Sequence, residues 1–197
     1  GSEMCIRDRN NTVILVTSDH GEAFYEHNRM SHNNTIYDEM LRVPFILHLP
    51  DGFDRGGFNL DRMATLADIV PTLLSTASLE PTASLDGVNL LHAARRKNKP
   101  FDRYFVGRTA HSTPMRCIRT SRWKATLANS GQGELFDLVE DPGEQRNLRH
   151  QHPEIFVALG QLLTRQLLEP PSITGAVRNS DVSDSDRKML EALGYVE

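Results

Sequence analysis

The chain has 197 residues, of which 39% are hydrophobic, enough for one packed domain and part of a second. Its 26 Asp and Glu residues outnumber its 22 Lys and Arg residues, so the net charge of −4 gives no reason to expect a nucleic-acid partner. A membrane-spanning helix needs about 18 or more consecutive apolar residues. The sequence contains no such run, so we expect no membrane span in this chain.

The first nine residues show no helical or strand periodicity and no turn pattern. We interpret residues 1–9 as an extraneous segment and leave them out of the predicted fold. This leaves Cys117 as a single cysteine, which cannot form an internal disulfide. Cysteine usage therefore does not indicate the redox compartment.

Two strands are predicted near the start of the chain. Residues 12–17 form a short continuous apolar run, which predicts a strand buried on both faces. Residues 43–49 predict a second strand, which ends at the turn-forming residues 50–52. Residues 18–42, between the two strands, predict an irregular loop rich in polar groups.

Residues 60–79 predict a helix, because apolar residues recur there at helical spacing. Proline is tolerated in the first turn of a helix, so Pro71 indicates that the regular helix begins close to Asp68. Residues 80–100, which contain two prolines and a glycine, predict a connection.

The second half of the chain predicts an antiparallel sheet covered by a helix. Short strands separated by turn signals are expected at residues 103–108, 116–120, 123–127 and 134–138. An amphipathic helix is expected at residues 153–168, with an apolar face formed by Phe156, Leu159, Leu163 and Leu167. Trp123 should pack on this helix. Residues 171–197 predict a tail with a short terminal helix.

Polar side chains gather where the first strand ends. Asp19 and His20 follow the strand directly, and His27 and His32 come within the next dozen residues. In an open α/β sheet, ligands bind just beyond the carboxyl ends of the strands. A carboxylate and an imidazole side by side suit a divalent cation. The alternative is that Asp19 only caps the turn after the strand.

Four segments, in this order, resemble the C-terminal part of a sulfatase of the alkaline-phosphatase superfamily: residues 17–22, 37–44, 67–74 and 134–148, with a further match at residues 190–196. The resemblance implies an α/β fold. Residues 10–100 would form the end of a large alkaline-phosphatase-like α/β domain. Residues 101–170 would form a small α+β subdomain with an antiparallel sheet and a covering helix.

The resemblance also implies roles for the polar residues. Asp19 and His20 would bind one divalent metal ion, with calcium expected, although manganese and zinc accept an imidazole nitrogen more readily. His32 would contact the ester and stabilise or protonate the leaving oxygen, as catalytic and substrate-binding residue. His27 would line the substrate entrance or make structural hydrogen bonds.

Four further residues of the same loop, namely Glu22, Asp38, Glu39 and Arg42, are expected to act indirectly. A buried arginine that pairs with a loop carboxylate would fix the loop that carries the metal ligands. We therefore expect Arg42 to make such a pair and none of the four residues to be catalytic.

The resemblance implies a sulfuric-ester hydrolase that converts a sulfated small molecule or carbohydrate to alcohol and sulfate. Neither Cys5 nor Cys117 lies in the Cys/Ser-x-Pro-x-Arg motif that supplies the formylglycine nucleophile, and the Asp-Asp pair that completes the metal site is also missing. We therefore expect a fragment that is inactive by itself.

Two alternatives stay open. One is a phosphodiesterase or phosphonate monoester hydrolase of the same superfamily, and the other is a non-catalytic binding or structural module. The resemblance favours a periplasmic or extracellular location, and the sequence does not indicate an oligomeric state.

Overall fold

The structure is a computed structural model that describes residues 9–32, 35–53, 57, 59–60, 63–95, 103–109 and 114–168. The predicted tail helix and nearly all of the segment 1–9 lie outside the described residues. The chain begins with a single 3-10 turn, η1 (Arg9–Asn11). In the described part of the chain, no helix is long and apolar enough to cross a membrane.

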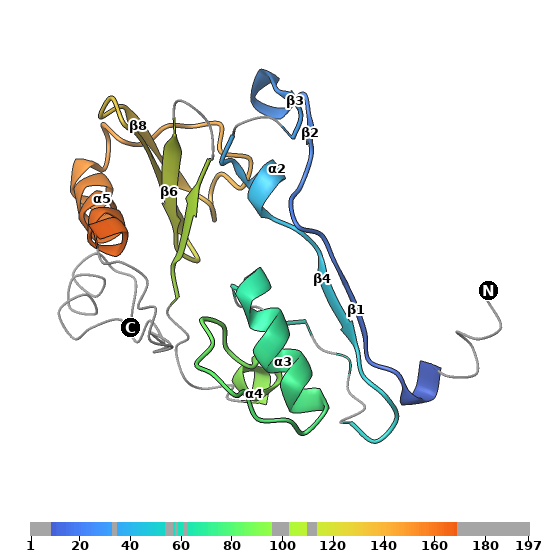
Figure 1. Cartoon of the computed structure of the whole chain (residues 1–197). Coiled ribbons are helices and arrows are strands. Elements are labelled where there is room, and N and C mark those ends of the chain that lie inside the picture. Colours follow the sequence, from blue (N-terminus) through green and yellow to red (C-terminus); the bar gives the residue numbers. More distant parts are fainter. Residues whose placement is uncertain are drawn as a thin grey trace.

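The two predicted strands of the first half pair with each other. Strand β1 (Ile14–Thr17) runs antiparallel to β4 (Phe45–His48), and the register joins Ile14 to His48 and Thr17 to Phe45 (Figure 1). Burial of β1 on both faces is wrong, because Val16 is 51% exposed and Ile46, opposite it on β4, is 61% exposed. The described residues add no third strand to this pair, so the apolar side chains on one face are left uncovered.

The predicted irregular loop between the two strands contains short regular elements. Strands β2 (Ala23–Phe24) and β3 (Met30–Ser31) form a hairpin around the 3-10 turn η2 (Glu26–Asn28), and α2 (Asp38–Leu41) is a single helical turn. Elements of two to four residues are too short to show a hydrophobic period in the sequence. They became visible only in the folded chain.

The helix predicted for residues 60–79 is confirmed for residues 66–76, while residues 63–65 are not helical. A 3-10 turn, η3 (Leu66–Asp68), leads into α3 (Ile69–Thr76), as Pro71 indicated. The predicted connection 80–100 contains a helix that the sequence analysis missed, α4 (Leu90–Arg95). Its first turn is capped by Asn89, whose Oδ1 accepts hydrogen bonds from the backbone N–H groups of Leu91 and His92. Leu90 is buried.

The C-terminal half is a four-stranded antiparallel sheet with a helix on one face, as predicted (Figure 1). The strands pair in chain order: β5 (Phe105–Arg108), β6 (Met115–Arg119), β7 (Trp123–Ala128) and β8 (Gly133–Asp137). Helix α5 (Pro153–Leu168) packs against β6 and β7. The hydrophobic core between sheet and helix contains Ile118, Trp123, Ala125, Leu135, Ile155, Leu159, Leu162 and Leu163.

The buried face of α5 differs slightly from the predicted one. Leu159 and Leu163 are buried as expected, and Trp123 packs in the same core. Leu167 is exposed, while Ile155 and Leu162 are buried instead. The face is therefore turned by part of a helical step, because the tilt of the helix on the sheet decides which flanking positions are covered.

Candidate active site

Asp19 and His20 lie in the turn that follows β1, and both line a cleft next to β4. The Ser18 hydroxyl donates to the His20 carbonyl oxygen at 2.6 Å, and the His20 backbone N–H donates to Asp19 Oδ1 at 3.0 Å. The turn is thus ordered by its own hydrogen bonds. The side chain of Asp19 is 87% exposed, so its carboxylate is free to meet a ligand.

The ring of His20 has a defined tautomer. Its Nδ1 lies 2.7 Å from the carbonyl oxygen of Gly21, and only a protonated nitrogen can donate to that oxygen. In the neutral ring, Nε2 then carries the lone pair and lies 3.9 Å from Asp19 Oδ1. A carboxylate oxygen and an imidazole nitrogen at this separation suit two ligands of one divalent cation, and a backbone carbonyl on the second ring nitrogen is typical of metal-bound histidines.

The same contacts shift the pKa values of the pair. The hydrogen bond to the Gly21 carbonyl, followed by the charge of Asp19, raises the pKa of His20. The nearby His20 ring and the backbone N–H of His20 lower the pKa of Asp19, which favours its ionised form. The lowered pKa of Asp19 favours a cation beside its carboxylate. The raised pKa of His20 means that a metal ion would compete with a proton for Nε2.

His32 lies next to this pair. Its ring centroid is 5.2 Å from that of His20, and its Nδ1 lies 3.3 Å from Glu22 Oε2. The imidazole is largely exposed. The fold thus brings together Asp19, His20 and His32, three of the four predicted site residues. The Glu22 carboxylate lies beside His32.

His27 has different surroundings. Its Nδ1 is 2.9 Å from Glu39 Oε1, and its Nε2 is 3.0 Å from the carbonyl oxygen of Glu144. The ring stacks on Tyr37 at 3.7 Å, and only 12% of the side chain is exposed. Both ring nitrogens are engaged within the protein. These contacts support the structural hydrogen-bonding role that the sequence left open.

We predict that His27 stabilises the protein more in acid than in alkali. Burial lowers the pKa of His27, but the Glu144 carbonyl and the Glu39 carboxylate more than offset it, and the net shift is upward. A group with a raised folded-state pKa contributes stability that is complete below its unfolded pKa, about 6.5, and is lost as pH rises through the folded value. His27→Gln should therefore reduce the unfolding free energy more at pH 5.5 than at pH 9 in urea denaturation. An equal loss of unfolding free energy at both pH values would contradict the raised pKa of His27 in the folded protein.

The ion pair that the sequence predicts for Arg42 is replaced by pairs from the C-terminal sheet. In the described part of the chain, Arg42 makes no ion pair and lines the same cleft as Asp19 and His20. The cations that meet Asp38 are Arg119 and Lys124, from β6 and β7. No short-range pattern in the sequence could have indicated these partners, because they lie more than 80 positions further along the chain.

The described residues contain no group of three or more His, Cys, Asp or Glu side chains placed to hold a metal ion together. Among these residues, Asp19 and His20 therefore have no third side chain of this kind placed to share a metal ion with them. The remaining ligands were predicted to come from a further Asp-Asp pair.

Comparison with known proteins identifies the family. The model of the family "N-sulphoglucosamine sulphohydrolase, C-terminal" matches residues 25–169. The chain is 33% identical over 147 residues to the Delta 4,5-hexuronate-2-O-sulfatase of Bacteroides thetaiotaomicron, covering 70% of this chain and 30% of that protein. It is 28% identical over 181 residues to human arylsulfatase K, covering 84% of this chain and 33% of that protein. The chain thus spans about a third of the length of these curated relatives.

Solved structures give the same result. The fold matches that of a 2-O GAG sulfatase with a TM-score of 0.68 and 27% identity, over 80% of this chain and 36% of the other. It also matches a phosphonate monoester hydrolase of Agrobacterium radiobacter with a TM-score of 0.66 and 21% identity, over 83% and 37%. The second match supports the fold alone. The predicted alkaline-phosphatase-like α/β fold with a C-terminal α+β subdomain is confirmed, and the chain belongs to the sulphoglucosamine sulphohydrolase C-terminal family of sulfatases.

Proposed function

We propose that the protein containing this chain is a metal-dependent sulfuric-ester hydrolase, which cleaves R–O–SO₃⁻ to an alcohol and sulfate. The observation that carries the proposal is the turn after β1, where Asp19 and His20 offer an oxygen and a nitrogen 3.9 Å apart with His32 beside them. The sulfatase relatives make this reaction the best match to that geometry.

The proposed metal ligands from this chain are Asp19 and His20. Sulfatases generally use a divalent metal, and such an ion draws charge from the ester oxygens and stabilises the charge that develops in the transition state. We propose calcium, because the exposed Asp19 carboxylate is a hard oxygen ligand. Manganese and zinc are the alternatives, since His20 contributes a nitrogen.

His32 is proposed to contact the ester and to protonate or stabilise the leaving oxygen. An imidazole can transfer a proton to a leaving oxygen, which suits this role, and the Glu22 carboxylate at 3.3 Å from Nδ1 can orient the ring. His27 would act one step removed, holding the hairpin next to the substrate entrance through Glu39 and Glu144.

The proposed nucleophile lies outside these 197 residues. Residues 112–116 have the letters Ser-x-Pro-x-Arg, but they lead into β6 of the C-terminal sheet, which the C-terminal family model covers. Cys117 is buried in β6, and burial raises the pKa of its thiol to about 11, so it does not serve as a nucleophile. We propose that the rest of the enzyme contributes the formylglycine and the other metal ligands, residues 10–100 complete its α/β domain, and residues 101–170 form the C-terminal subdomain.

The proposed substrate is a sulfated carbohydrate. One relative is named for hexuronate 2-O-sulfate, and one solved structure of the same fold holds D-glucosamine-2-N,6-O-disulfate. Asp19 and His32 are both largely exposed in this chain, so a sulfate ester can reach them from solvent.

The role of His32 predicts a dependence on the leaving group. Replacing a general acid lowers the rate by about 10² to 10⁴-fold. In the full-length protein, His32→Ala should lower kcat this much for a sugar sulfate but less than tenfold for 4-nitrophenyl sulfate, whose leaving oxygen needs no proton. Glu140→Ala, at an exposed carboxylate in the turn after β8, is the control. Equal losses on both substrates would remove His32 from proton transfer.

A substrate panel tests the proposal against its rivals. The full-length protein should release sulfate from a sulfated hexuronate or glucosamine with kcat/KM at least tenfold above that for a phosphonate monoester. A reversed preference would favour the phosphonate monoester hydrolase, whose fold the chain shares. No turnover of either ester would favour a binding module.

A further inference from the structure

We propose that Asp38 is a positioning residue for the Asp19–His20 turn, and that Lys124 and Arg119 of the C-terminal sheet hold Asp38 in place. The inference rests on the proposed function, because it assigns how that site is kept in shape. It implies that the C-terminal subdomain organises the catalytic loop in addition to lying beside it.

The first step is the contact between α2 and the sheet. Asp38 Oδ1 lies 2.9 Å from Lys124 Nζ, and Asp38 Oδ2 lies 3.0 Å from Arg119 Nη2. Arg119 Nε donates to the same carboxylate at 3.3 Å. The side chain of Lys124 is 0% exposed, so its ammonium group meets no water. Two cations from neighbouring strands thus bind one loop carboxylate out of solvent.

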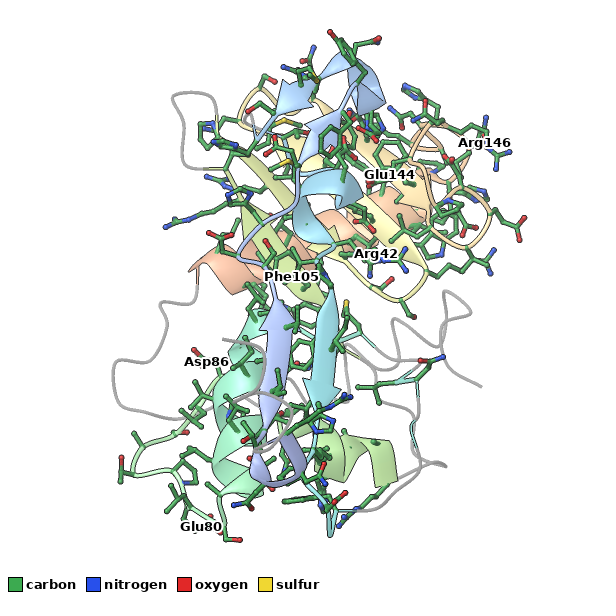
Figure 2. The ribbon with its side chains drawn as sticks, turned by 90° about the vertical axis from the view of Figure 1, so that its right-hand side faces the viewer. Arg42, Glu80, Asp86, Phe105, Glu144 and Arg146 are labelled. Carbon is green, nitrogen blue, oxygen red and sulfur yellow. The ribbon has the colours of Figure 1, made fainter. Side chains whose placement is uncertain are left out.

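Glu144 closes the same cluster from the segment after β8. Its Oε1 lies 2.8 Å from Lys124 Nζ, and its Oε2 accepts a hydrogen bond from the backbone N–H of Asp38. Figure 2 shows Glu144 beside α2, the light-blue helical turn. Two buried carboxylates therefore face two cations, and the cluster is balanced in charge. Burial opposes ionisation of Asp38, but Lys124 and Arg119 outweigh it and hold its pKa below the usual value.

The second step joins α2 to the proposed metal ligands. The backbone N–H of Gly21 donates to the carbonyl oxygen of Met40 at 2.9 Å. The approach is so close that a Cβ on Gly21 would lie 1.9 Å from the carbonyl oxygen of Glu39, which only glycine permits. The Gly21 carbonyl in turn accepts from Nδ1 of His20. A shift of α2 therefore moves the group that sets the orientation and tautomer of His20.

A second carboxylate of the chain provides a matched control. Asp68 is fully buried and accepts two hydrogen bonds from Arg103, at 2.7 and 3.0 Å. It joins η3 to the segment before β5, and its described hydrogen bonds stay outside residues 19–42. Asp38→Asn and Asp68→Asn each remove the charge of one buried carboxylate. Only Asp38 belongs to α2, which is hydrogen-bonded to Gly21 next to His20.

The experiment compares these two variants in the full-length protein. Hydrogen exchange measured by mass spectrometry on overlapping peptides reports the amide of Gly21. Asp38→Asn should speed that exchange at least tenfold, lower kcat for a sulfate ester at least tenfold and change KM less than threefold. Asp68→Asn should change the Gly21 exchange and kcat less than twofold, even where it lowers the Tm as much. If Asp38→Asn does not fold, Arg119→Gln takes its place with the same expectation.

The proposal is overturned if Gly21 exchange stays unchanged in Asp38→Asn, or if both variants change exchange and kcat alike, since the pair would then only stabilise the fold. The readouts also separate the two proposals. Faster Gly21 exchange in a protein whose wild type releases no sulfate would leave the coupling of α2 to the turn intact and defeat the proposed function.

Discussion

Asp19→Asn should lower kcat/KM of the full-length protein for a sulfate ester by at least about 10³-fold. The substitution keeps the size of the side chain and removes the charge that the proposed metal ion needs. Because Asp19 is exposed, no buried group is left unpaired and the fold should be unaffected. The loss should therefore appear in metal content and turnover, with a Tm within about 1 °C of the wild type.

Two readouts check this result. Elemental analysis of the purified variant should show less than a tenth of the metal bound by the wild type, and sulfate release should fall in parallel. Asp86 is exposed and is not among the residues that line the cleft (labelled in Figure 2). Asp86→Asn is therefore the matched control and should change neither quantity. A variant that keeps its metal and most of its activity would show that Asp19 only caps the turn after β1.

Lys124→Met should cost about 3–5 kcal/mol in unfolding free energy, the largest effect on stability that we expect from a single change. The methionine keeps most of the length of the lysine stem but removes the ammonium group that lies between Asp38 and Glu144. Two carboxylates are then left in a dry environment with Arg119 as their remaining cation. Burial raises the pKa of Glu144 even in the intact cluster. Its ionised form is therefore unfavourable at this place unless a cation lies beside it.

Urea denaturation at neutral pH measures the cost. Arg122→Met, which removes the half-exposed cation from the Arg122–Asp137 pair, should cost only about 1 kcal/mol or less. Adding Glu144→Gln to Lys124→Met should recover part of the loss, because the second change removes one of the stranded charges. If Lys124→Met and Arg122→Met lower the unfolding free energy equally, the buried cluster would not be what stabilises the contact between α2 and the sheet.

The C-terminal sheet and helix could be predicted from the sequence because each element is long enough to show its own period. Helix α5 begins at Pro153 as predicted, since proline marks a first helical turn and the apolar residues repeat for four turns after it. The α2 turn and the β2–β3 hairpin could not be predicted, because four residues or fewer show no period and owe their shape to tertiary contacts.

The candidate site could be predicted in part. The position of Asp19 and His20 after a strand followed from local pattern, and His32 does lie beside them. The bond from His27 to Glu144 and the contacts of Asp38 with the C-terminal half did not follow, because they join positions 81 to 117 residues apart. The mistaken expectation for β1 has a related cause. A continuous apolar run indicates that both faces of a strand can be buried. Whether they are buried depends on elements from other parts of the protein that pack on them.

The most direct test of the central claim is sulfate release by the full-length protein before and after removal of its metal. A purified sample incubated with a sulfated hexuronate should release sulfate, lose at least 99% of that activity on chelation with EDTA, and recover it when calcium is restored. Recovery with manganese or zinc alone would keep the mechanism and change the metal. Sulfate release that continues unchanged in the metal-free protein would contradict the proposed site at Asp19 and His20.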